Sequence, residues 1–187
     1  GSDSAHFNDA IGLMLANGVS LPEAMLRLMP PSKYKIDHPE MIKFIMASMR
    51  AMGGFGMWEG PAGVIGIDSE HYVSHLDRLG LRPLGGRLVD DPVLGKVFAE
   101  ASEKGAFRFD PKNILQTMQH RAGGINMVHE GRLLRDDEVF DWVLNNSGLN
   151  VEELGGDSFR TFHPYGFLTN GSKEVSLSNR EVEGNDI

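Results

Sequence analysis

The sequence predicts an α+β fold, because segments with helical and strand periodicity occupy separate parts of the chain. Apolar residues recur every three or four positions over much of residues 4–52, which is typical of helices that bury one face. Short β-prone runs bounded by turn residues follow from residue 61 onward. A last helical pattern spans residues 136–145. Helices before and after a block of hairpins indicate an α+β domain.

The first helix is expected over residues 4–17. Asp3 or Ser4 can cap its free backbone amides, and Gly18 supplies the stop. Its apolar stripe consists of Phe7, Ile11, Met14 and Leu15.

Two more helices are expected before residue 53. Ser20-Leu21-Pro22-Glu23 has the form of a capping box with a proline in the first turn, and it opens a short helix that ends before Pro30-Pro31. Residues 39–52 carry a third helix, which Gly53-Gly54 closes.

Two hairpins and a last helix complete the predicted elements. The runs 61–67 and 71–77 flank Asp68-Ser69-Glu70, and the runs 125–128 and 132–134 flank Glu130-Gly131. The last helix begins at an Asp136 cap and stops near Gly148. Between the hairpins, residues 91–103 place apolar side chains at helical spacing, which favours a helix although Gly95 interrupts it.

The composition restricts the classes of partner. With 187 residues, 41% of them hydrophobic, the chain can form one domain with a sizeable core. The net charge of −8 argues against binding to nucleic acid or to an anionic membrane surface. The absence of a membrane-length apolar run and of a signal-peptide pattern leads us to expect a cytoplasmic protein.

Several short segments carry a family resemblance in their order and spacing. They are Gly1-Ser2-Asp3-Ser4-Ala5-His6-Phe7, Ser20-Leu21-Pro22-Glu23-Ala24-Met25, Trp58-Glu59-Gly60-Pro61-Ala62, Leu76-Asp77-Arg78-Leu79-Gly80-Leu81-Arg82-Pro83, Asn113-Ile114, Gly123-Gly124 and Glu130-Gly131-Arg132-Leu133-Leu134. This series resembles the second half of the glutamine amidotransferase domain of glutamate synthase, a class II enzyme with an N-terminal nucleophile. The same resemblance places a strand, not a helix, around residues 97–102.

The resemblance implies a four-layer αββα sandwich of the N-terminal-nucleophile hydrolase type. In that family a cysteine thiolate at the start of the first half attacks the glutamine amide, whereas this chain has no cysteine. The expectation is therefore an incomplete half, inactive alone, whose nucleophile comes from a second polypeptide. Residues 1–154 would form the amidotransferase-like half and residues 155–187 a polar extended arm or tail. No cofactor is implied, because the flavin and iron–sulfur parts of glutamate synthase lie outside this domain.

Asp3 is the candidate substrate-binding residue. In the resembled family the aspartate of Ser-Asp-Ser accepts hydrogen bonds from the α-ammonium of glutamine, and a carboxylate beside helix amides stays ionised for that purpose. The alternative is a plain helix N-cap.

The segment from Asp77 to Pro83 resembles an Asp-Arg-Asn-Gly-Leu-Arg-Pro turn of the same amidotransferases. Gly80 permits a positive φ, and Arg82 is held extended by the proline that follows it. Leu79 replaces the usual asparagine, so we interpret Asp77, Arg78, Gly80 and Arg82 as parts of a structural turn. Gly85-Gly86 stands where the family has an aromatic-rich strand.

No metal site is expected. His71 and His75 have the spacing of neighbours on one strand face, but they lack a third ligand nearby in sequence. We expect His71 in a turn and His75 on a half-buried strand. The ten methionines lie mostly at core spacing.

Two functional hypotheses follow. In the first, the chain is a subunit or fragment of a glutamate-synthase-like amidotransferase that binds glutamine and completes a glutaminase site. In the second, it is a non-catalytic amidotransferase-like scaffold or regulatory module of a larger complex. The intact Ser2-Asp3-Ser4 favours the first, and the changes at Leu79 and Gly85-Gly86 favour the second.

Overall fold

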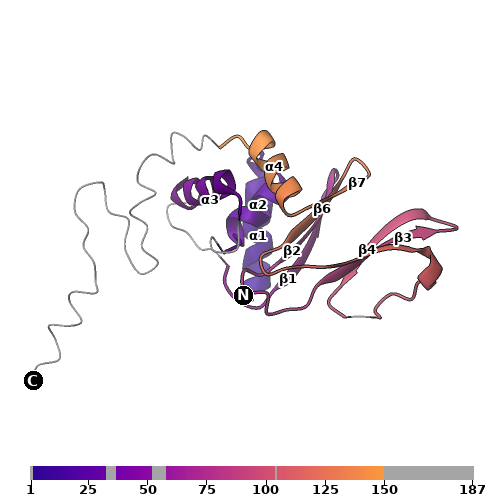
Figure 1. The fold of residues 1–187 in the computed structure, drawn as a ribbon. Coiled ribbons are helices and arrows are strands. Elements are labelled where there is room, and N and C mark those ends of the chain that lie inside the picture. The colour runs from indigo at the N-terminus through magenta and orange to yellow at the C-terminus, as the bar shows by residue number, and fades with distance from the viewer. Residues whose placement is uncertain (1, 33–36, 52–57, 104, 150–187) are drawn as a thin grey trace, which may run out of the picture.

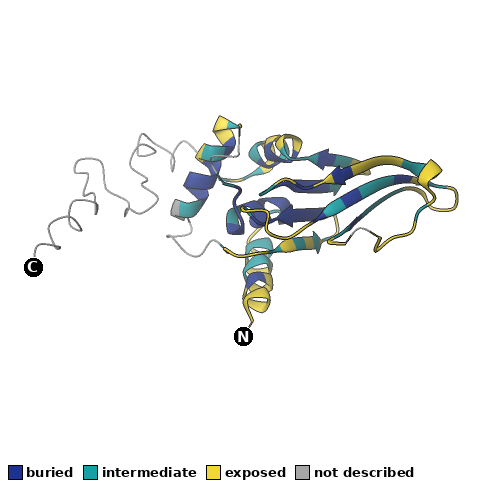
Figure 2. Cartoon of the chain, turned by 60° about the horizontal axis from the view of Figure 1, so that its bottom comes forward, coloured by how far each residue is buried: buried dark blue, intermediate teal, exposed yellow. Residues whose placement is uncertain are grey.

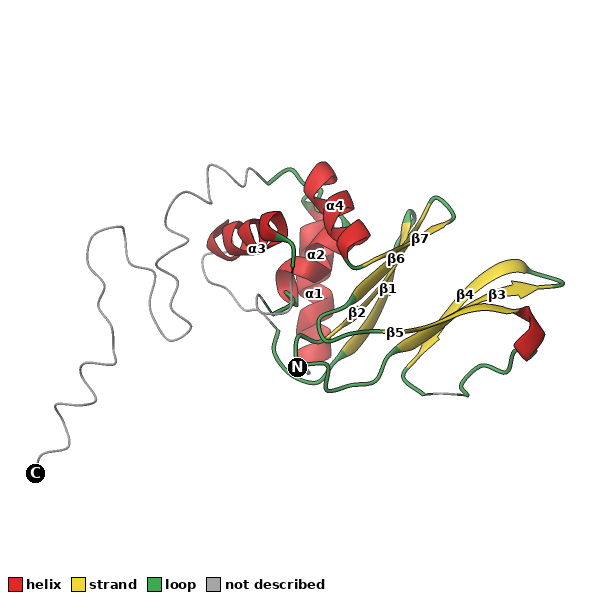
Figure 3. Ribbon diagram, viewed as in Figure 1, coloured by secondary structure: helices red, strands yellow, loops and turns green. Residues whose placement is uncertain are grey.

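The computed structural model describes residues 2–32, 37–51, 58–103 and 105–149 (Figure 1). The predicted arm or tail from residue 155 onward lies outside the described residues. The elements, in chain order, are α1 (Asp3–Ala16), α2 (Leu21–Leu28), α3 (Pro39–Ala51), β1 (Gly63–Ile67), β2 (His71–Leu76), β3 (Gly85–Asp91), β4 (Gly95–Ala101), the 3₁₀ turn η2 (Pro111–Asn113), β5 (Ile114–Gln119), β6 (Ile125–His129), β7 (Arg132–Arg135) and α4 (Asp137–Asn146) (Figure 3).

The strands form two antiparallel sheets, and the α+β prediction is confirmed. The larger sheet has the order β1-β2-β6-β7, and the smaller has the order β4-β3-β5. Both predicted hairpins are present, as β1-β2 and β6-β7. The smaller sheet is inserted in the sequence between β2 and β6, and its two ends meet where the His120 amide donates to the Leu84 carbonyl at 3.0 Å.

Helices α1–α4 lie on one side of the larger sheet, and the smaller sheet lies on the other (Figure 1). The main core forms between the helices and the larger sheet, because alternate strand residues point to the helix side. Its buried members include Leu21, Met25, Leu26, Met41, Phe44, Val73, Ile125, Met127, Val139, Phe140 and Val143.

Helix α1 is the least covered of the helices whose side chains are all described (Figure 2). Of its predicted stripe only Phe7 is buried, where it packs with Leu28 and Met29. Ile11, Met14 and Leu15 are partly exposed.

Three of the expected helix caps differ from the structure. Ser2, and not Asp3 or Ser4, is the N-cap of α1, and its hydroxyl accepts a hydrogen bond from the Ala5 amide at 3.4 Å. Ser20 and Asp136 occupy the N-cap positions of α2 and α4, but neither side chain caps its helix. The Asp136 carboxylate instead accepts from the Ile125 amide at 3.2 Å and so joins α4 to β6.

The helix favoured for residues 91–103 is wrong, because this segment forms a turn and strand β4. Asp91 accepts hydrogen bonds from the Val93 and Leu94 amides. Gly95, which follows the turn and begins β4, has a φ of +74°. Val93 and Leu94, whose spacing favoured a helix, are 87% and 75% exposed at the tip. Pairing with β3 along its whole length overrides the local pattern.

The interpretation that Gly85-Gly86 replaces a strand is also wrong, because β3 begins at these residues. A Cβ at Gly86 would lie 2.8 Å from Cγ of Glu100 and 2.9 Å from the Phe98 ring. The glycine therefore lets two large side chains of β4 cross over the start of β3 towards the larger sheet.

In the described part of the chain, no helix is long and apolar enough to span a lipid bilayer.

Candidate functional site

Asp3 lies in the first turn of α1 and is exposed. Since Ser2 caps the helix, the Asp3 carboxylate has no capping role. The structure therefore leaves this carboxylate available to a cation.

A cavity of about 860 Å³ opens beside Asp3. Its walls are one face of α1, the loop formed by residues 58–62 (the 58–62 loop), strand β1 and the side chains of Leu21, Met25 and Met29. This volume is typical of a small-molecule site, and most of the lining residues are apolar or glycine. Asp3 and Glu59 are the charged residues of the lining, and both are acidic. The cavity therefore favours a ligand with a cationic group.

The turn from Asp77 to Pro83 is organised by the Asp77 carboxylate. This buried group accepts hydrogen bonds from the backbone amides of Leu79 at 3.1 Å, Leu81 at 3.2 Å and Arg82 at 3.4 Å. It also accepts from the Ala62 amide at 3.2 Å, which ties the turn to the 58–62 loop. Asp77 thus acts through its carboxylate and Arg82 through its backbone amide, and neither residue lines the cavity.

Gly80 and Gly123 let two turns approach closely. Gly80 has a φ of +68°, and a Cβ there would lie 2.9 Å from Cβ of Ala122. Gly123 has a φ of +69°, and a Cβ there would lie 2.6 Å from Cβ of Pro31. The Gly123 amide also donates to the Asp77 carbonyl at 2.9 Å. The turn from Asp77 to Pro83 (the motif turn), the turn formed by residues 121–124 and Pro31 therefore form one packed unit.

His71 and His75 point to the same side of β2 but do not share a ligand. His71 is the first residue of β2 and not part of a turn, and its Nδ1 lies 3.1 Å from Asp68 Oδ1. Its ring stacks on that of His129 at 4.8 Å, with Trp142 against both. His75 is fully buried, and not half-buried as predicted. The described residues contain no group of three side chains suited to a metal ion.

Burial lowers the pKa of His75 to about 3, and repulsion from His120 adds to the effect. Below pH 6.5 the unfolded chain therefore binds a proton on His75 that the folded chain does not bind until about pH 3. The free energy of unfolding should fall by about 1.4 kcal/mol per pH unit well below the unfolded pKa. We expect His75→Phe to remove this slope in urea titrations between pH 6 and 4.5, and His6→Phe, on an exposed position of α1, to keep it. Parallel slopes in wild type and His75→Phe would contradict the prediction.

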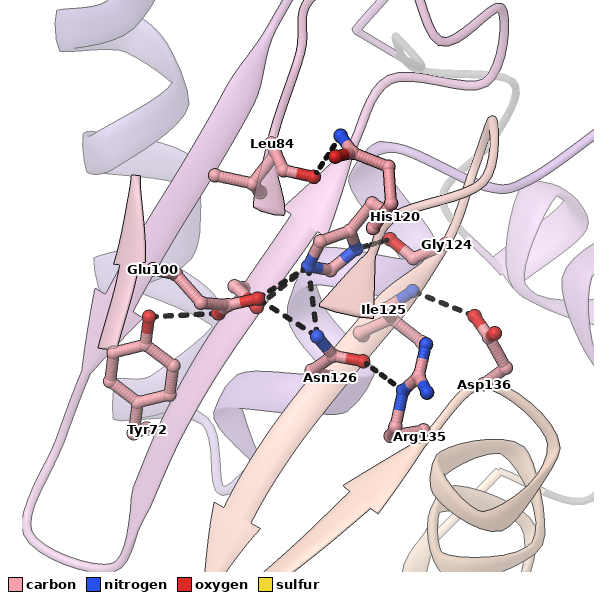
Figure 4. A network of polar contacts seen from close by, with 11 residues as sticks. Tyr72, Leu84, Glu100, His120, Gly124, Ile125, Asn126, Arg135 and Asp136 are labelled. Atoms are coloured by element: carbon pink, nitrogen blue, oxygen red, sulfur yellow. Dashed lines mark hydrogen bonds and ion pairs between the residues drawn. The ribbon is translucent and has the colours of Figure 1, made fainter. Parts of the chain in front are cut away.

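A buried polar network, which the sequence did not reveal, joins the two sheets (Figure 4). Glu100 of β4 accepts hydrogen bonds from the Tyr72 hydroxyl at 2.9 Å and the Asn126 amide at 2.8 Å. His120 Nε2 lies 2.7 Å from Glu100 Oε1 and 3.2 Å from the Ser74 hydroxyl. The other ring nitrogen of His120 lies 3.1 Å from the Gly124 carbonyl, to which it donates.

The network holds Glu100 in its charged form. Burial alone would raise the pKa of the Glu100 carboxyl, but hydrogen bonds from His120 and Ser74, the charge of His120 and the Tyr72 hydroxyl outweigh it and keep the pKa below its usual value. Burial and the Glu100 charge in turn raise the pKa of Tyr72. The network (the polar joint) thus links the two sheets through hydrogen bonds, and the polar side chains named here have partners within it.

Comparisons with known proteins give the family. A family model described as class-II glutamine amidotransferases matches residues 1–148. The chain is 34% identical over 144 residues to Glutamate synthase [NADH] of Schizosaccharomyces pombe, which covers 74% of this chain and 6% of the relative. It is 33% identical over 198 residues to the chloroplastic ferredoxin-dependent glutamate synthase of Spinacia oleracea (98% of this chain, 11% of the relative). Ferredoxin-dependent glutamate synthase 2 of Arabidopsis thaliana is 31% identical over 194 residues (97% and 11%).

The chain thus spans about a tenth or less of the length of these relatives. The family model covers every helix and strand of the structure, from α1 to α4. The chain therefore belongs to the class-II glutamine amidotransferases and is a domain of the glutamate synthase type.

Proposed function

We propose that this chain binds glutamine and completes the glutaminase site of a glutamate-synthase-like class-II amidotransferase. In this proposal the nucleophilic cysteine, which is not among these 187 residues, is supplied by a second polypeptide. The observation that carries the proposal is the exposed Asp3 in the lining of a cavity whose charged lining residues are both acidic. That arrangement suits the α-ammonium of an amino acid.

In this proposal the two sheets are the inner layers of a four-layer αββα sandwich, with α1–α4 as one outer layer. The partner polypeptide adds strands at β1, which is at an edge of the larger sheet. An open edge bearing apolar side chains invites pairing with another strand. Ile65 and Ile67 of β1 are 43% and 74% exposed, and they point to the same side as Ser74 and Tyr72, towards the smaller sheet. Residues 1–154 would then act as one half of the domain.

The first step of the test is to isolate the native complex through this chain and to sequence the N-terminus of every polypeptide in it. A companion that begins with cysteine is the expected result. The isolated chain should release no ammonia from glutamine, whereas the complex should do so. A complex without an N-terminal cysteine would favour the scaffold or regulatory hypothesis.

The second step is Asp3→Asn in the complex. The variant keeps the shape and a hydrogen-bond acceptor but loses the charge opposite the ammonium. Because charge-assisted hydrogen bonds contribute about 1.5–3 kcal/mol, we expect glutamine affinity to fall roughly ten- to hundredfold in calorimetry. Asp9→Asn, the same change on an exposed α1 residue outside the cavity lining, should leave affinity unchanged. Equal affinities for wild type and Asp3→Asn would remove Asp3 from the site.

A further inference from the structure

The 58–62 loop forms the cavity wall next to the start of α1, and its two ends are fixed. At one end the Trp58 amide donates to the Leu28 carbonyl at 2.7 Å, which ties the loop to the end of α2. At the other end Ala62 and Asp77 exchange hydrogen bonds, one from the Asp77 amide to the Ala62 carbonyl at 2.8 Å and one from the Ala62 amide to the Asp77 carboxylate at 3.2 Å. The loop therefore follows a defined path along the cavity wall.

Trp58 connects this loop directly to the residue that bears the candidate carboxylate. Its indole Nε1 donates to the backbone carbonyl of Asp3 at 3.2 Å. Its ring also packs edge-on against Phe7, one turn further along α1, with the centroids 5.5 Å apart. The two contacts hold the first turn of α1, and hence the Asp3 backbone, against the loop.

Glu59 connects the same loop to the motif turn. Its carboxylate forms an ion pair of 2.8 Å with the Arg78 guanidinium. The Arg78 backbone is fixed in turn by the bonds to Asp77 on one side and by the close approach of Gly80 to Ala122 on the other. The pair also engages Glu59, so that among the described residues of the cavity lining Asp3 is the carboxylate without an ion pair.

We propose that Trp58, Glu59 and Arg78 are positioning residues for Asp3, and that the turn from Asp77 to Pro83 is the support from which they act. Trp58 sets the place of the Asp3 backbone, and the Glu59–Arg78 pair sets the place of Trp58 and keeps Glu59 from competing for the ligand's ammonium. This inference rests on the proposed function, in which Asp3 binds glutamine. The sequence indicated only a structural role for the motif turn. The inference adds a role in substrate binding, through the support that the turn gives to Arg78.

The test compares matched variants in the native complex with L-glutamine as substrate. Trp58→Phe keeps the packing on Phe7 but removes the N–H donor, so the KM for glutamine should rise about three- to tenfold with kcat unchanged. Arg78→Met removes the ion pair between partly exposed side chains, so the KM should rise about two- to fivefold. Arg78→Lys keeps a cation within reach of Glu59 and should restore most of the affinity. Arg132→Met, on an exposed residue of β7, is the control and should change nothing.

Hydrogen exchange of the amides of residues 5–7 gives a readout that does not need glutamine. It should be faster in Trp58→Phe and in Arg78→Met than in wild type or Arg78→Lys. Unchanged KM values, or equal losses in Arg78→Lys and Arg78→Met, would overturn the inference. If the wild-type complex binds no glutamine, the proposed function fails, and the exchange rates alone then test whether these residues hold the first turn of α1. Exchange rates that do not change in the variants would reject this positioning role.

Discussion

Replacement of Glu100 by alanine is expected to lower the free energy of unfolding by about 3–5 kcal/mol, the range seen when one partner of a buried charged pair is removed. The deletion would leave the Tyr72 hydroxyl, the Asn126 amide and His120 Nε2 buried without their common acceptor. It would also remove the polar link between β4 and the larger sheet, because Glu100 is the β4 residue of the network (Figure 4).

Urea denaturation at pH 7 followed by circular dichroism measures this loss. Glu100→Gln, which keeps an acceptor oxygen and the side-chain volume, should lose less than Glu100→Ala. Glu103→Ala, an exposed neighbour, should stay within about 0.5 kcal/mol of wild type. The wild-type stabilisation from Glu100 is present above its unfolded pKa of about 4.5 and is lost as the pH falls through its lower folded pKa. A loss in Glu100→Ala no larger than in Glu103→Ala would show that the network does not stabilise the fold.

Gly123→Ala is expected to cost about 3–4 kcal/mol, because two penalties add. The backbone has a φ of +69°, which L residues rarely adopt, and the new Cβ would lie 2.6 Å from Cβ and 2.9 Å from Cα of Pro31. Both atoms belong to a proline ring, which cannot rotate away. Since Gly123 also donates to the Asp77 carbonyl, the clash would disturb the turn that supports the cavity loop.

Gly131→Ala separates the two penalties. This residue has nearly the same backbone conformation, with a φ of +73°, but a Cβ there meets nothing within 4 Å. It should cost only the backbone strain, about 1–2 kcal/mol. Thermal or urea unfolding of the two variants side by side checks the difference. Equal losses would mean that the contact with Pro31 relaxes without cost.

Local pattern was sufficient for the elements whose side-chain periodicity agrees with their burial. The helical spacing in α2 and α3 and the turn residues Asp68 and Gly131 gave elements that the structure contains. Local pattern missed the smaller sheet, of which the family resemblance indicated one strand, around residues 97–102, and the reason is physical. Gly85 and Gly86 look like a break in the sequence, but glycine is required at position 86 to admit Phe98 and Glu100 of the neighbouring strand. This requirement for glycine arises only when the two strands pair, so the local sequence of one strand does not show it.

The candidate site was predictable in part, through the family resemblance. Asp3 was identified in this way, and the structure places it beside a cavity of suitable size. The cavity itself was not predictable, because its walls come from α1 and from a loop more than 40 residues later. The same is true of the polar network, since Tyr72, Glu100 and Asn126 meet only when the two sheets pack.

The hydrogen bond between the Leu84 carbonyl and the His120 amide determines where this domain can accept insertions. Because the smaller sheet leaves and re-enters the larger one at a single point, it can change in length at its far end without altering the path of β2 or β6. The tip around Val93 and Leu94 is therefore a permissive position for insertions and for attached reporter sequences. Changes near Glu100, by contrast, would be transmitted to the rest of the domain, because that end alone carries the buried polar joint. The smaller sheet thus has one end that should tolerate insertions and one end on which the packing of the two sheets depends.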